Sequence, residues 1–378
     1  MQKKVLILGG GSGGVITANK LAEILGDQVD VTVVDRNAEH TFIAAYPWVA
    51  FGLREVQQIR RPLVALQKRG IRFLQAEVRA LHPDRGVVET DRGELGYDYL
   101  IVSLGAEPLP SPVEGAQAPW SEAGALAVRS WLRESQGERW VVGVASPFYP
   151  CPPAPYEVAG QLDFALRVKG LRSRSSIEIF HMNPAPLAGM GPVISHAVLK
   201  ILKRKDVTFH GNFELAEGGD GVLKAKDGRT LEYDRLILVP PFAPNKVVRE
   251  SPLAGPGGFP EVSPETFRSL KYPNVFVIGD TVNPALGLPP AGVVVHYQGE
   301  YIAGVIAADL RGAYIGEPFN AVAMCIMDFG DDAILPQCDF TEMLAGRGMI
   351  SCGVMATGRS VRIAKMLFES MFFAAMFG

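Results

Sequence analysis

Residues 4–35 read KVLILGGGSGGVITANKLAEILGDQVDVTVVD, and this stretch decides the fold. An apolar run at residues 4–8 enters a turn of five glycines and one serine. A helical pattern follows as far as Leu25, and a second apolar run ends at Asp35. The order strand, GxGxxG turn, helix, strand and acidic residue is typical of a dinucleotide-binding unit.

Each residue type in this turn has a physical reason. Gly9 permits the tight turn, Gly11 lets the backbone approach a pyrophosphate, and Gly14 lets the helix pack closely on the strand. The helix begins near Ser12, and its N-terminus attracts phosphate charge. Asp35 can accept hydrogen bonds from a ribose diol. The stretch therefore predicts that a dinucleotide binds here.

Further apolar strands alternate with helical patterns along the chain. They are expected at residues 99–103, 140–145, 176–180, 235–239 and 275–278. Strands separated by helices imply parallel sheets with crossover connections. We predict an α/β fold with two Rossmann-like dinucleotide-binding domains and a C-terminal membrane-interface segment.

Composition excludes several classes of function. The 378 residues carry 37 Lys and Arg against 40 Asp and Glu, a net charge of −3, so no nucleic-acid partner is expected. The four cysteines have no CxxC spacing and no histidines cluster near them, which argues against a metal site. No apolar stretch reaches 18 residues, so no membrane-spanning helix is expected.

Three segments resemble the FAD fingerprint of the two-dinucleotide-binding-domain flavoproteins. They are the first turn with Asp35, residues 97–105 (YDYLIVSLG) and residues 274–280 (NVFVIGD). In that family the middle segment usually ends in A-T-G, whereas here it ends in S-L-G. The resemblance implies that Asp280 contacts the ribityl chain and that a helix opening at Pro290-Ala291-Gly292 points at the flavin pyrimidine edge. The residues expected to bind FAD are Gly9, Gly11, Ser12, Gly14, Asp35, Arg36, Val78, Ser103, Gly105, Gly279, Asp280, Ala291 and Gly292.

The fingerprint also divides the chain. Residues 1–105 and 245–320 are predicted to form a discontinuous FAD-binding domain, residues 106–244 a second Rossmann-like domain, and residues 321–378 a cap with an amphipathic helix. A nicotinamide site would need a second glycine-rich turn in the middle domain. That position, residues 146–157, reads SPFYPCPPAPYE and contains no glycine. Prolines lack the N–H groups that cradle a pyrophosphate, so the middle domain is predicted to bind no nucleotide.

Cys151 lies just before the helix expected near residues 155–166, where the helix N-terminus should lower its pKa; a buried, inert cysteine is the alternative. The surrounding CPPAPYE resembles the CPPGPYE segment of the sulfide-oxidising flavoproteins. These are the sulfide:quinone oxidoreductases and the flavin subunit of flavocytochrome c sulfide dehydrogenase. Residues 324–331 (MCIMDFGD) are similar to a second segment of that family, C-x-x-D-F/M-G. The resemblance implies that Cys151 and Cys325 face each other beside the flavin as a redox-active disulfide or sulfur-bridged pair.

The chain departs from that family in places and leaves some roles open. No cysteine occurs in residues 41–48, where flavocytochrome subunits attach the cofactor, so FAD is predicted to be non-covalent. Cys338 and Cys352 match no motif, and the favoured interpretation is two spare core or surface thiols. Glu157 is either a proton shuttle at the sulfide site or a carboxylate that the helix dipole stabilises. His181 and His196 either titrate sulfide or line its path, or are structural residues, which is the favoured interpretation.

Residues 360–378 read SVRIAKMLFESMFFAAMFG, which predicts an amphipathic helix. Arg359, Arg362, Lys365 and Glu369 share one narrow face, and apolar residues cover the rest. This pattern fits a helix at the surface of a membrane, although docking in the core or in a dimer interface remains an alternative. Quinone-reducing family members end in a similar basic–aromatic segment, which implies that Phe368 and Phe372 lie at a quinone site.

These observations lead to one functional hypothesis and three alternatives. We expect a peripheral membrane enzyme that oxidises sulfide to sulfane sulfur or polysulfide and passes the electrons through FAD to quinone. A sulfide dehydrogenase that reduces a cytochrome c, a type II NADH dehydrogenase, and a flavin-bearing assembly or sensor subunit without turnover remain open. A homo-oligomer is possible, and the quinone type and the side of the membrane are undetermined.

Overall fold

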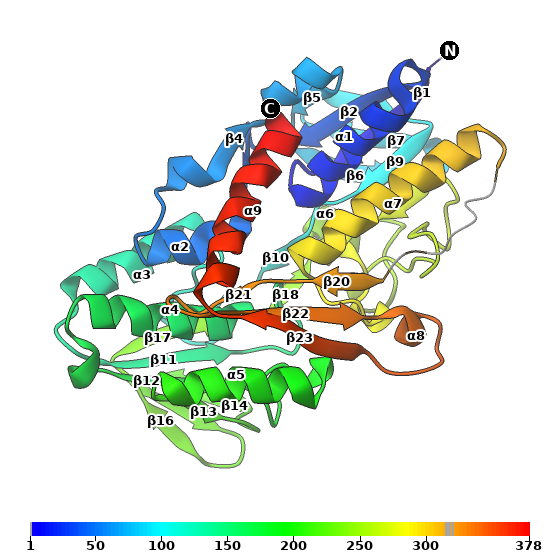
Figure 1. The fold of residues 1–378 in the computed structure, drawn as a ribbon. Helices are drawn as coiled ribbons and strands as arrows, with labels where there is room; N and C mark the ends of the chain where they lie inside the picture. Colours follow the sequence, from blue (N-terminus) through cyan, green and yellow to red (C-terminus); the bar gives the residue numbers. More distant parts are fainter. Residues whose placement is uncertain (1, 314–318, 320) are drawn as a thin grey trace.

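The computed structural model describes residues 2–313, 319 and 321–378. A five-stranded parallel sheet has the order β19-β9-β1-β2-β5 (Figure 1). Its strands are β1 (Lys3–Leu8), β2 (Val29–Asp35), β5 (Arg72–Gln75), β9 (Tyr99–Val102) and β19 (Val275–Val277). Helices α1 (Ser12–Leu25) and α7 (Gly292–Leu310) pack against each other beside it. The apolar strands are buried on both faces, as a parallel sheet between helices requires.

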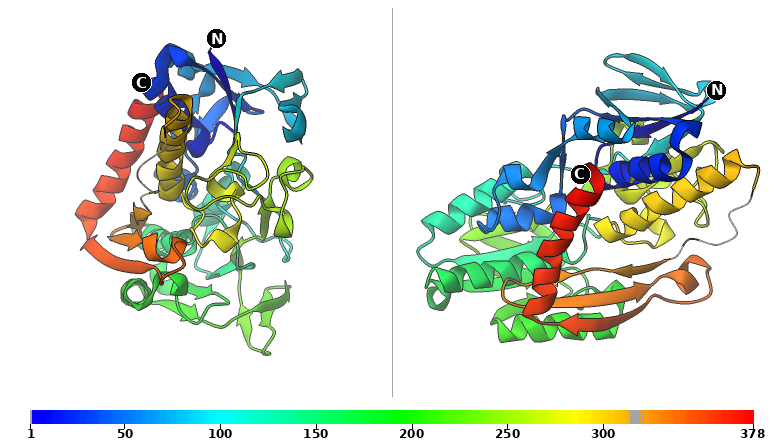
Figure 2. Two further views of the ribbon diagram at one scale, coloured as in Figure 1. Left: turned by 90° about the vertical axis from the view of Figure 1, so that its right-hand side faces the viewer. Right: turned by 45° about the horizontal axis from the view of Figure 1, so that its top comes forward.

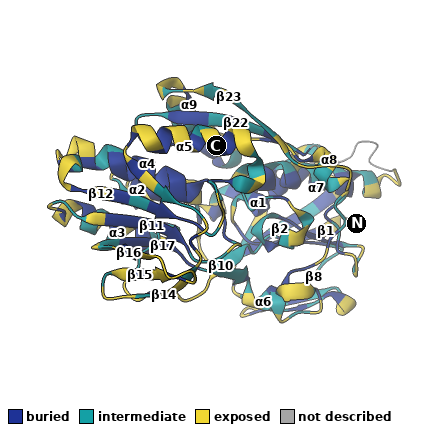
Figure 3. Cartoon of the chain, turned by 90° about the horizontal axis from the view of Figure 1, so that it is seen from below, coloured by how far each residue is buried: buried dark blue, intermediate teal, exposed yellow. Residues whose placement is uncertain are grey.

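A second parallel sheet, of four strands, has the order β13-β12-β11-β17. Its strands are β11 (Arg139–Val144), β12 (Ser176–Phe180), β13 (Val207–His210) and β17 (Arg235–Val239), and its helices are α3 (Glu122–Glu134), α4 (Ala154–Val168) and α5 (Pro192–Arg204). A short antiparallel pair, β10 (Ala106–Pro108) with β18 (Phe242–Pro244), lies where the chain passes between the two sheets. Figure 3 shows the buried residues concentrated along the strands of both sheets.

Smaller elements lie outside the two parallel sheets, and their strands form separate antiparallel sheets. They are β3 (Glu39–Thr41), β4 (Arg60–Pro62), β6 (Val78–His82), β7 (Val87–Thr90), β8 (Gly93–Gly96), β14 (Leu215–Gly219), β15 (Val222–Ala225), β16 (Thr230–Glu232), α2 (Tyr46–Ala50) and α6 (Lys246–Arg249). The α/β fold with two Rossmann-like sheets is confirmed. The exact domain boundaries stay a prediction, and residues 314–318 and 320, next to the expected start of the cap, lie outside the described residues.

The C-terminal part forms a third, antiparallel sheet and a long helix. Its strands are β20 (Val322–Met324), β21 (Met327–Asp328), β22 (Ala333–Asp339) and β23 (Ser351–Thr357), with α8 (Thr341–Leu344) between the last two. Helix α9 (Arg359–Phe377) then runs back toward α1, as the red helix of Figures 1 and 2 shows. Asn19 Nδ2 in α1 donates to the Met376 carbonyl at 3.3 Å and fixes the end of α9. In the described part of the chain, every helix is too short or too polar to cross a membrane.

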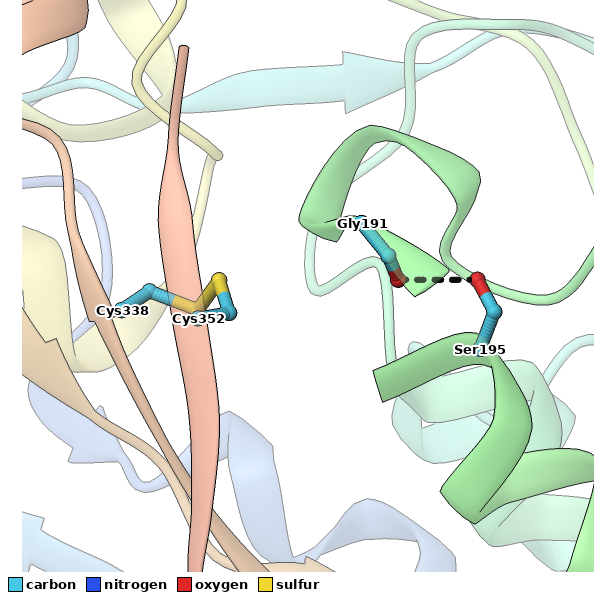
Figure 4. The surroundings of a disulfide bond; sticks show 4 residues. All are labelled: Gly191, Ser195, Cys338 and Cys352. Atoms are coloured by element: carbon cyan, nitrogen blue, oxygen red, sulfur yellow. Dashed lines mark hydrogen bonds between the residues drawn. A yellow bond between two sulfur atoms is a disulfide. The ribbon is translucent and has the colours of Figure 1, made fainter. Parts of the chain in front are cut away.

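Cys338 and Cys352 form a disulfide, so the prediction of two spare thiols is wrong. The two residues lie directly opposite each other on β22 and β23, with their Cα atoms 4.1 Å apart. Figure 4 shows the bond near the start of α5, where Ser195 Oγ donates to the Gly191 carbonyl at 3.1 Å. The physical reason is cross-strand pairing, which the spacing of the cysteines in the sequence does not reveal.

Removing this disulfide is expected to destabilise the C-terminal sheet. The two cysteines are 14 residues apart, and a closed loop of about this length is worth about 3 kcal/mol of unfolding free energy. The double variant Cys338→Ala/Cys352→Ala should therefore unfold at a lower urea concentration than the oxidised protein. Wild type treated with a dithiol reductant is the matched control and should resemble the variant. An unchanged urea midpoint in both would contradict the stabilising role.

Candidate active site

The first glycine turn has the shape that a dinucleotide needs. A Cβ atom on Gly9 would lie 2.2 Å from the Ser103 carbonyl oxygen, and one on Gly14 would lie 1.9 Å from the Gly9 carbonyl oxygen. Gly9 also has φ +104°, which side chains rarely adopt. A Cβ atom on Gly11 would meet nothing within 4 Å. Two glycines are thus required by close packing, and the third leaves an open backbone face toward which a pyrophosphate fits.

The carboxyl ends of the first sheet bring the other predicted contacts together. Asp35 ends β2, and its Oδ2 accepts from the Gly10 N–H at 2.6 Å. The Gly105 N–H donates to Thr281 Oγ1 at 2.8 Å, which joins the ends of β9 and β19. The Gly279 N–H donates to Gln298 Oε1 in α7, also at 2.8 Å. Ligands bind at this edge in open α/β sheets.

The remaining predicted contacts differ in position. Ser12 begins α1, and Ala291 and Gly292 begin α7. Ser103 follows β9, and its N–H donates to the Leu8 carbonyl at 2.9 Å. Arg36 is exposed after Asp35, whereas Val78 begins β6 in a separate small sheet.

The carboxylate of Asp280 is available to a polar ligand. It makes no hydrogen bond or ion pair with any residue that the structure describes, and desolvation raises its pKa to about 6. A cavity of about 20 Å³ is lined by the neighbouring Gly279 and, among others, by Phe148, Pro290 and Ala291. Asp280 is half-buried, and a desolvated acid without a partner is costly. Ligand hydroxyls would relieve that cost, so the residues fit the ribityl chain of FAD.

Cys151 is held against the start of α7. Its N–H donates to the Pro290 carbonyl at 2.7 Å, and its backbone has φ +59°, a left-handed conformation that is uncommon outside glycine. The second sheet and α4 thus present this cysteine to the helix that the resemblance places at the flavin. Such strained positions cluster at functional sites.

Cys325 comes from the third sheet, between β20 and β21, and its N–H donates to the Pro336 carbonyl at 3.2 Å. Both Cys151 and Cys325 are free, half-buried thiols in this structure. Each feels the charges of Glu157 and Lys365, and Cys325 acts electrostatically on Cys151. The two thiols therefore lie around one ion pair.

The predicted lowering of the Cys151 pKa is wrong. Burial raises the pKa of this thiol well above its ordinary value, and the negative charge of Glu157 adds to the effect. Burial likewise raises the pKa of Cys325 to about 11. Helix α4 begins only at Ala154, so desolvation outweighs any attraction from the helix N-terminus. Lys365 opposes both shifts and is the local charge that favours a thiolate.

Glu157 and Lys365 form a buried ion pair at the centre of the site. Lys365 Nζ in α9 donates to Glu157 Oε1 in α4, and the same oxygen accepts from the Asp328 N–H at 2.5 Å. Their side chains are only 5% and 15% exposed. Burial raises the pKa of Glu157, whereas Lys365 lowers it. Glu157 is in the first turn of α4, so both predicted roles stand, but the sequence did not reveal its partner.

The two histidines lie in different environments. His181 is buried, its Nδ1 accepts from the Asn183 N–H at 2.9 Å, and Tyr149 lies 3.3 Å from its Nε2. Burial lowers its pKa to about 4, so it is neutral at physiological pH. His196 is exposed on α5. These positions fit structural roles for both.

Helix α9 turns its charged face toward the protein, whereas an isolated helix in a membrane surface would turn that face to water. Arg362 Nε donates to Asp328 Oδ1 at 3.2 Å, Lys365 pairs with Glu157, and Glu369 accepts from Arg54 at 2.9 Å. The charged face of α9 is therefore the face that packs against the rest of the protein. The outward side is apolar, and no charged residue of α9 beyond Arg359 is exposed.

The two phenylalanines predicted at a quinone site are placed differently. Phe368 is 46% exposed and lies 6.3 Å from Phe42, between ring centroids. Phe372 is buried, with its ring 5.5 Å from His40 and 5.2 Å from Phe42. His40 in turn lies against the dinucleotide turn, because its Nδ1 is 2.9 Å from the Gly10 carbonyl. The aromatic residues of α9 thus reach the segment that follows the first nucleotide turn.

Comparison with known proteins shows which proteins this chain resembles. The profile of the pyridine nucleotide-disulphide oxidoreductases matches residues 3–146. The mitochondrial sulfide:quinone oxidoreductase of Mus musculus is 29% identical over 300 residues, which cover 74% of this chain and 66% of that protein. The chain is similar in sequence to the sulfide:quinone oxidoreductases. The solved sulfide:quinone oxidoreductase of Aquifex aeolicus has the same fold, with a TM-score of 0.88 at 23% identity over 99% of this chain and 91% of that one.

The relationship to sulfide:quinone oxidoreductases confirms the resemblance predicted from the cysteine segments and the FAD fingerprint. A type II NADH:quinone oxidoreductase of Staphylococcus haemolyticus is 32% identical over only 108 residues, or 28% of this chain. The sequence match to this NADH-dependent enzyme is therefore confined to a small part of the chain. The match to the sulfide:quinone oxidoreductases extends over most of it.

Proposed function

We propose that this protein is an FAD-dependent sulfide:quinone oxidoreductase. One observation carries the proposal: the Glu157–Lys365 ion pair joins α4, which follows Cys151, to the segment that carries Cys325, and the Cys151 N–H donates to the Pro290 carbonyl two residues before α7. The middle domain also lacks a second glycine turn for a nicotinamide cofactor. Bound FAD, held non-covalently by the first glycine turn, Asp35 and Asp280, supplies the acceptor for two electrons.

The protein's own residues prepare the sulfur chemistry. The family resemblance implies that the reactive form is a Cys151–Cys325 disulfide; in the free form described here, burial raises the pKa of both thiols, which makes them poor nucleophiles. Hydrosulfide attacks one sulfur, a new S–S bond forms to it, and the bond between the cysteines breaks. The departing cysteine leaves as a thiolate beside the Lys365 ammonium group. Glu157 lies at the same point and can hold or move a proton.

The outer face of α9 is proposed to contact the lipid in which quinone dissolves. Ile363, Leu367 and Met371 recur every four residues and are 58%, 58% and 68% exposed. An apolar stripe without interspersed charges is unusual on a soluble surface and marks a contact site. We infer a peripheral association with the cell membrane through this stripe, with Phe368 at its edge and Phe372 beneath it.

Charging this stripe is expected to weaken membrane binding without disturbing the active site. The double variant Leu367→Glu/Met371→Glu should lower partition to phosphatidylcholine–phosphatidylglycerol vesicles at least about 10-fold, because both side chains lose apolar contact and gain charge. Val168→Glu is the matched control, since Val168 is 72% exposed at the end of α4, a different helix. Equal vesicle co-sedimentation of the double variant and wild type would show that lipid does not contact α9.

The proposed function is tested by anaerobic titration of the purified holoenzyme with sulfide in detergent. Sulfide should bleach the flavin absorbance, and decylubiquinone should restore it without any cytochrome. Bleaching by NADH but not by sulfide would support the type II NADH dehydrogenase instead. Reoxidation by cytochrome c but not by decylubiquinone would favour a sulfide dehydrogenase. No bleaching by any donor would support a subunit without turnover.

A further inference from the structure

Asp328 contacts several elements around the active site, and none of the roles assigned above accounts for these contacts. Its carboxylate accepts from Trp48 Nε1 in α2 at 2.8 Å and from Arg362 Nε in α9 at 3.2 Å. It also accepts from the Gly330 N–H at 2.8 Å, which closes the turn after β21. The side chain is completely buried. A buried carboxylate with three donors is a satisfied structural anion.

The main chain of Asp328 contacts the active site directly. Its N–H donates to Glu157 Oε1 at 2.5 Å, and its carbonyl accepts from Gln161 Nε2 at 3.1 Å. Both partners are in α4, the helix that follows Cys151. Asp328 itself is three residues after Cys325, so the orientation of this peptide affects the backbone that carries the second cysteine. Side chain and main chain of one residue thus connect α2, α4, α9 and the Cys325 segment.

We propose that Asp328 is a positioning residue that fixes the Cys325 segment and the Glu157 carboxylate relative to the docked helix α9. Its carboxylate holds Arg362, which brings Lys365, one helical turn later, onto Glu157. Its N–H holds Glu157 from the other side. This inference rests on the proposed function for its catalytic consequence, but the docking of α9 through Asp328 can be tested without any substrate.

The negative charge of Asp328 balances the positive charge of Arg362. The Arg362 side chain is only 19% exposed, so water cannot fully replace this counter-charge. Asparagine in place of Asp328 would keep an oxygen for the Trp48 indole or for the Gly330 N–H, but would leave Arg362 without a counter-charge. Removing one partner of a buried pair is strongly destabilising for the contact it makes. The expected result is that the first turns of α9 detach from β21, against which α9 packs.

The test compares Asp328→Asn, Arg362→Gln and Trp48→Phe in the FAD-loaded, full-length protein. Chymotrypsin cleavage within α9 should be about 10-fold faster in Asp328→Asn and in Arg362→Gln than in wild type. The limiting rate of flavin bleaching by sulfide should fall about 10-fold in Asp328→Asn, with the half-saturating sulfide concentration unchanged. Trp48→Phe should have a smaller effect on both. Asp339→Asn, an exposed acid of the same sheet, is the matched control and should behave as wild type.

The outcomes separate this inference from the proposed function. Wild-type cleavage and wild-type bleaching in Asp328→Asn would overturn it. If wild type is not bleached by sulfide, the proposed function fails, and the cleavage rates alone decide whether Asp328 docks α9. If Asp328→Asn does not fold, Arg362→Gln decides, since its side chain is closer to the surface: protected α9 in that variant would also overturn the inference.

Discussion

Replacing Cys151 with serine is expected to slow the reduction of the bound flavin by sulfide at least about 10³-fold. Serine has no sulfur to form a disulfide with Cys325, so hydrosulfide has no S–S bond to attack. Loss of a covalent catalytic residue commonly costs three or more orders of magnitude. The measurement is stopped-flow absorbance of the oxidised flavin after anaerobic mixing with sulfide.

The other two cysteines provide the control for this prediction. Cys338→Ala/Cys352→Ala removes the disulfide of the third sheet but leaves both Cys151 and Cys325, so any flavoprotein that still folds should be bleached by sulfide. Dithionite should bleach all variants, which shows that FAD is bound. Bleaching of Cys151→Ser at the wild-type rate would refute the cysteine mechanism even if sulfide remains the donor.

The nucleotide-binding part of the fold is predictable from the sequence because its determinants are local. A Cβ atom on Gly9 or on Gly14 would lie only 2.2 or 1.9 Å from a backbone oxygen of the adjacent strand end or of the same turn, so both positions require glycine. Asp35 is the last residue of its strand. The cysteines of the site were found through two short segments. Neither inference depends on how distant elements pack.

The features that sequence reasoning missed all depend on long-range packing. The Cys338–Cys352 bond exists because β22 and β23 pair in one register, and a shift by one residue would separate the two side chains. The pKa of Cys151 rises because packing of the surrounding chain desolvates the thiol, which its place before a helix does not show. The charged face of α9 is visible in the sequence, but its partners Asp328, Glu157 and Arg54 are 34, 208 and 315 residues away from the residues that they pair with.

Replacing Lys365 with methionine is expected to destabilise the protein by about 3–5 kcal/mol at pH 8, because the buried Glu157 carboxylate loses its counter-charge. Sulfide-driven bleaching should also fall, since the departing thiolate loses the Lys365 cation that favours it. The double variant Glu157→Gln/Lys365→Met removes both charges and should recover part of the lost stability. Urea unfolding followed by tryptophan fluorescence measures all three proteins. Wild-type stability in Lys365→Met would show that the ion pair contributes nothing.

The pH dependence of Lys365→Met has a definite sign. Burial already raises the pKa of Glu157 above its ordinary value of 4.5, and loss of Lys365 removes the main influence that lowers it. A carboxyl with a higher pKa in the folded state binds its proton more tightly there than in the unfolded chain. The free energy of unfolding therefore falls as pH rises from 4.5 toward the folded-state pKa. Lys365→Met should thus be more stable relative to wild type at pH 5 than at pH 8. This difference should vanish in the double variant, because glutamine does not titrate.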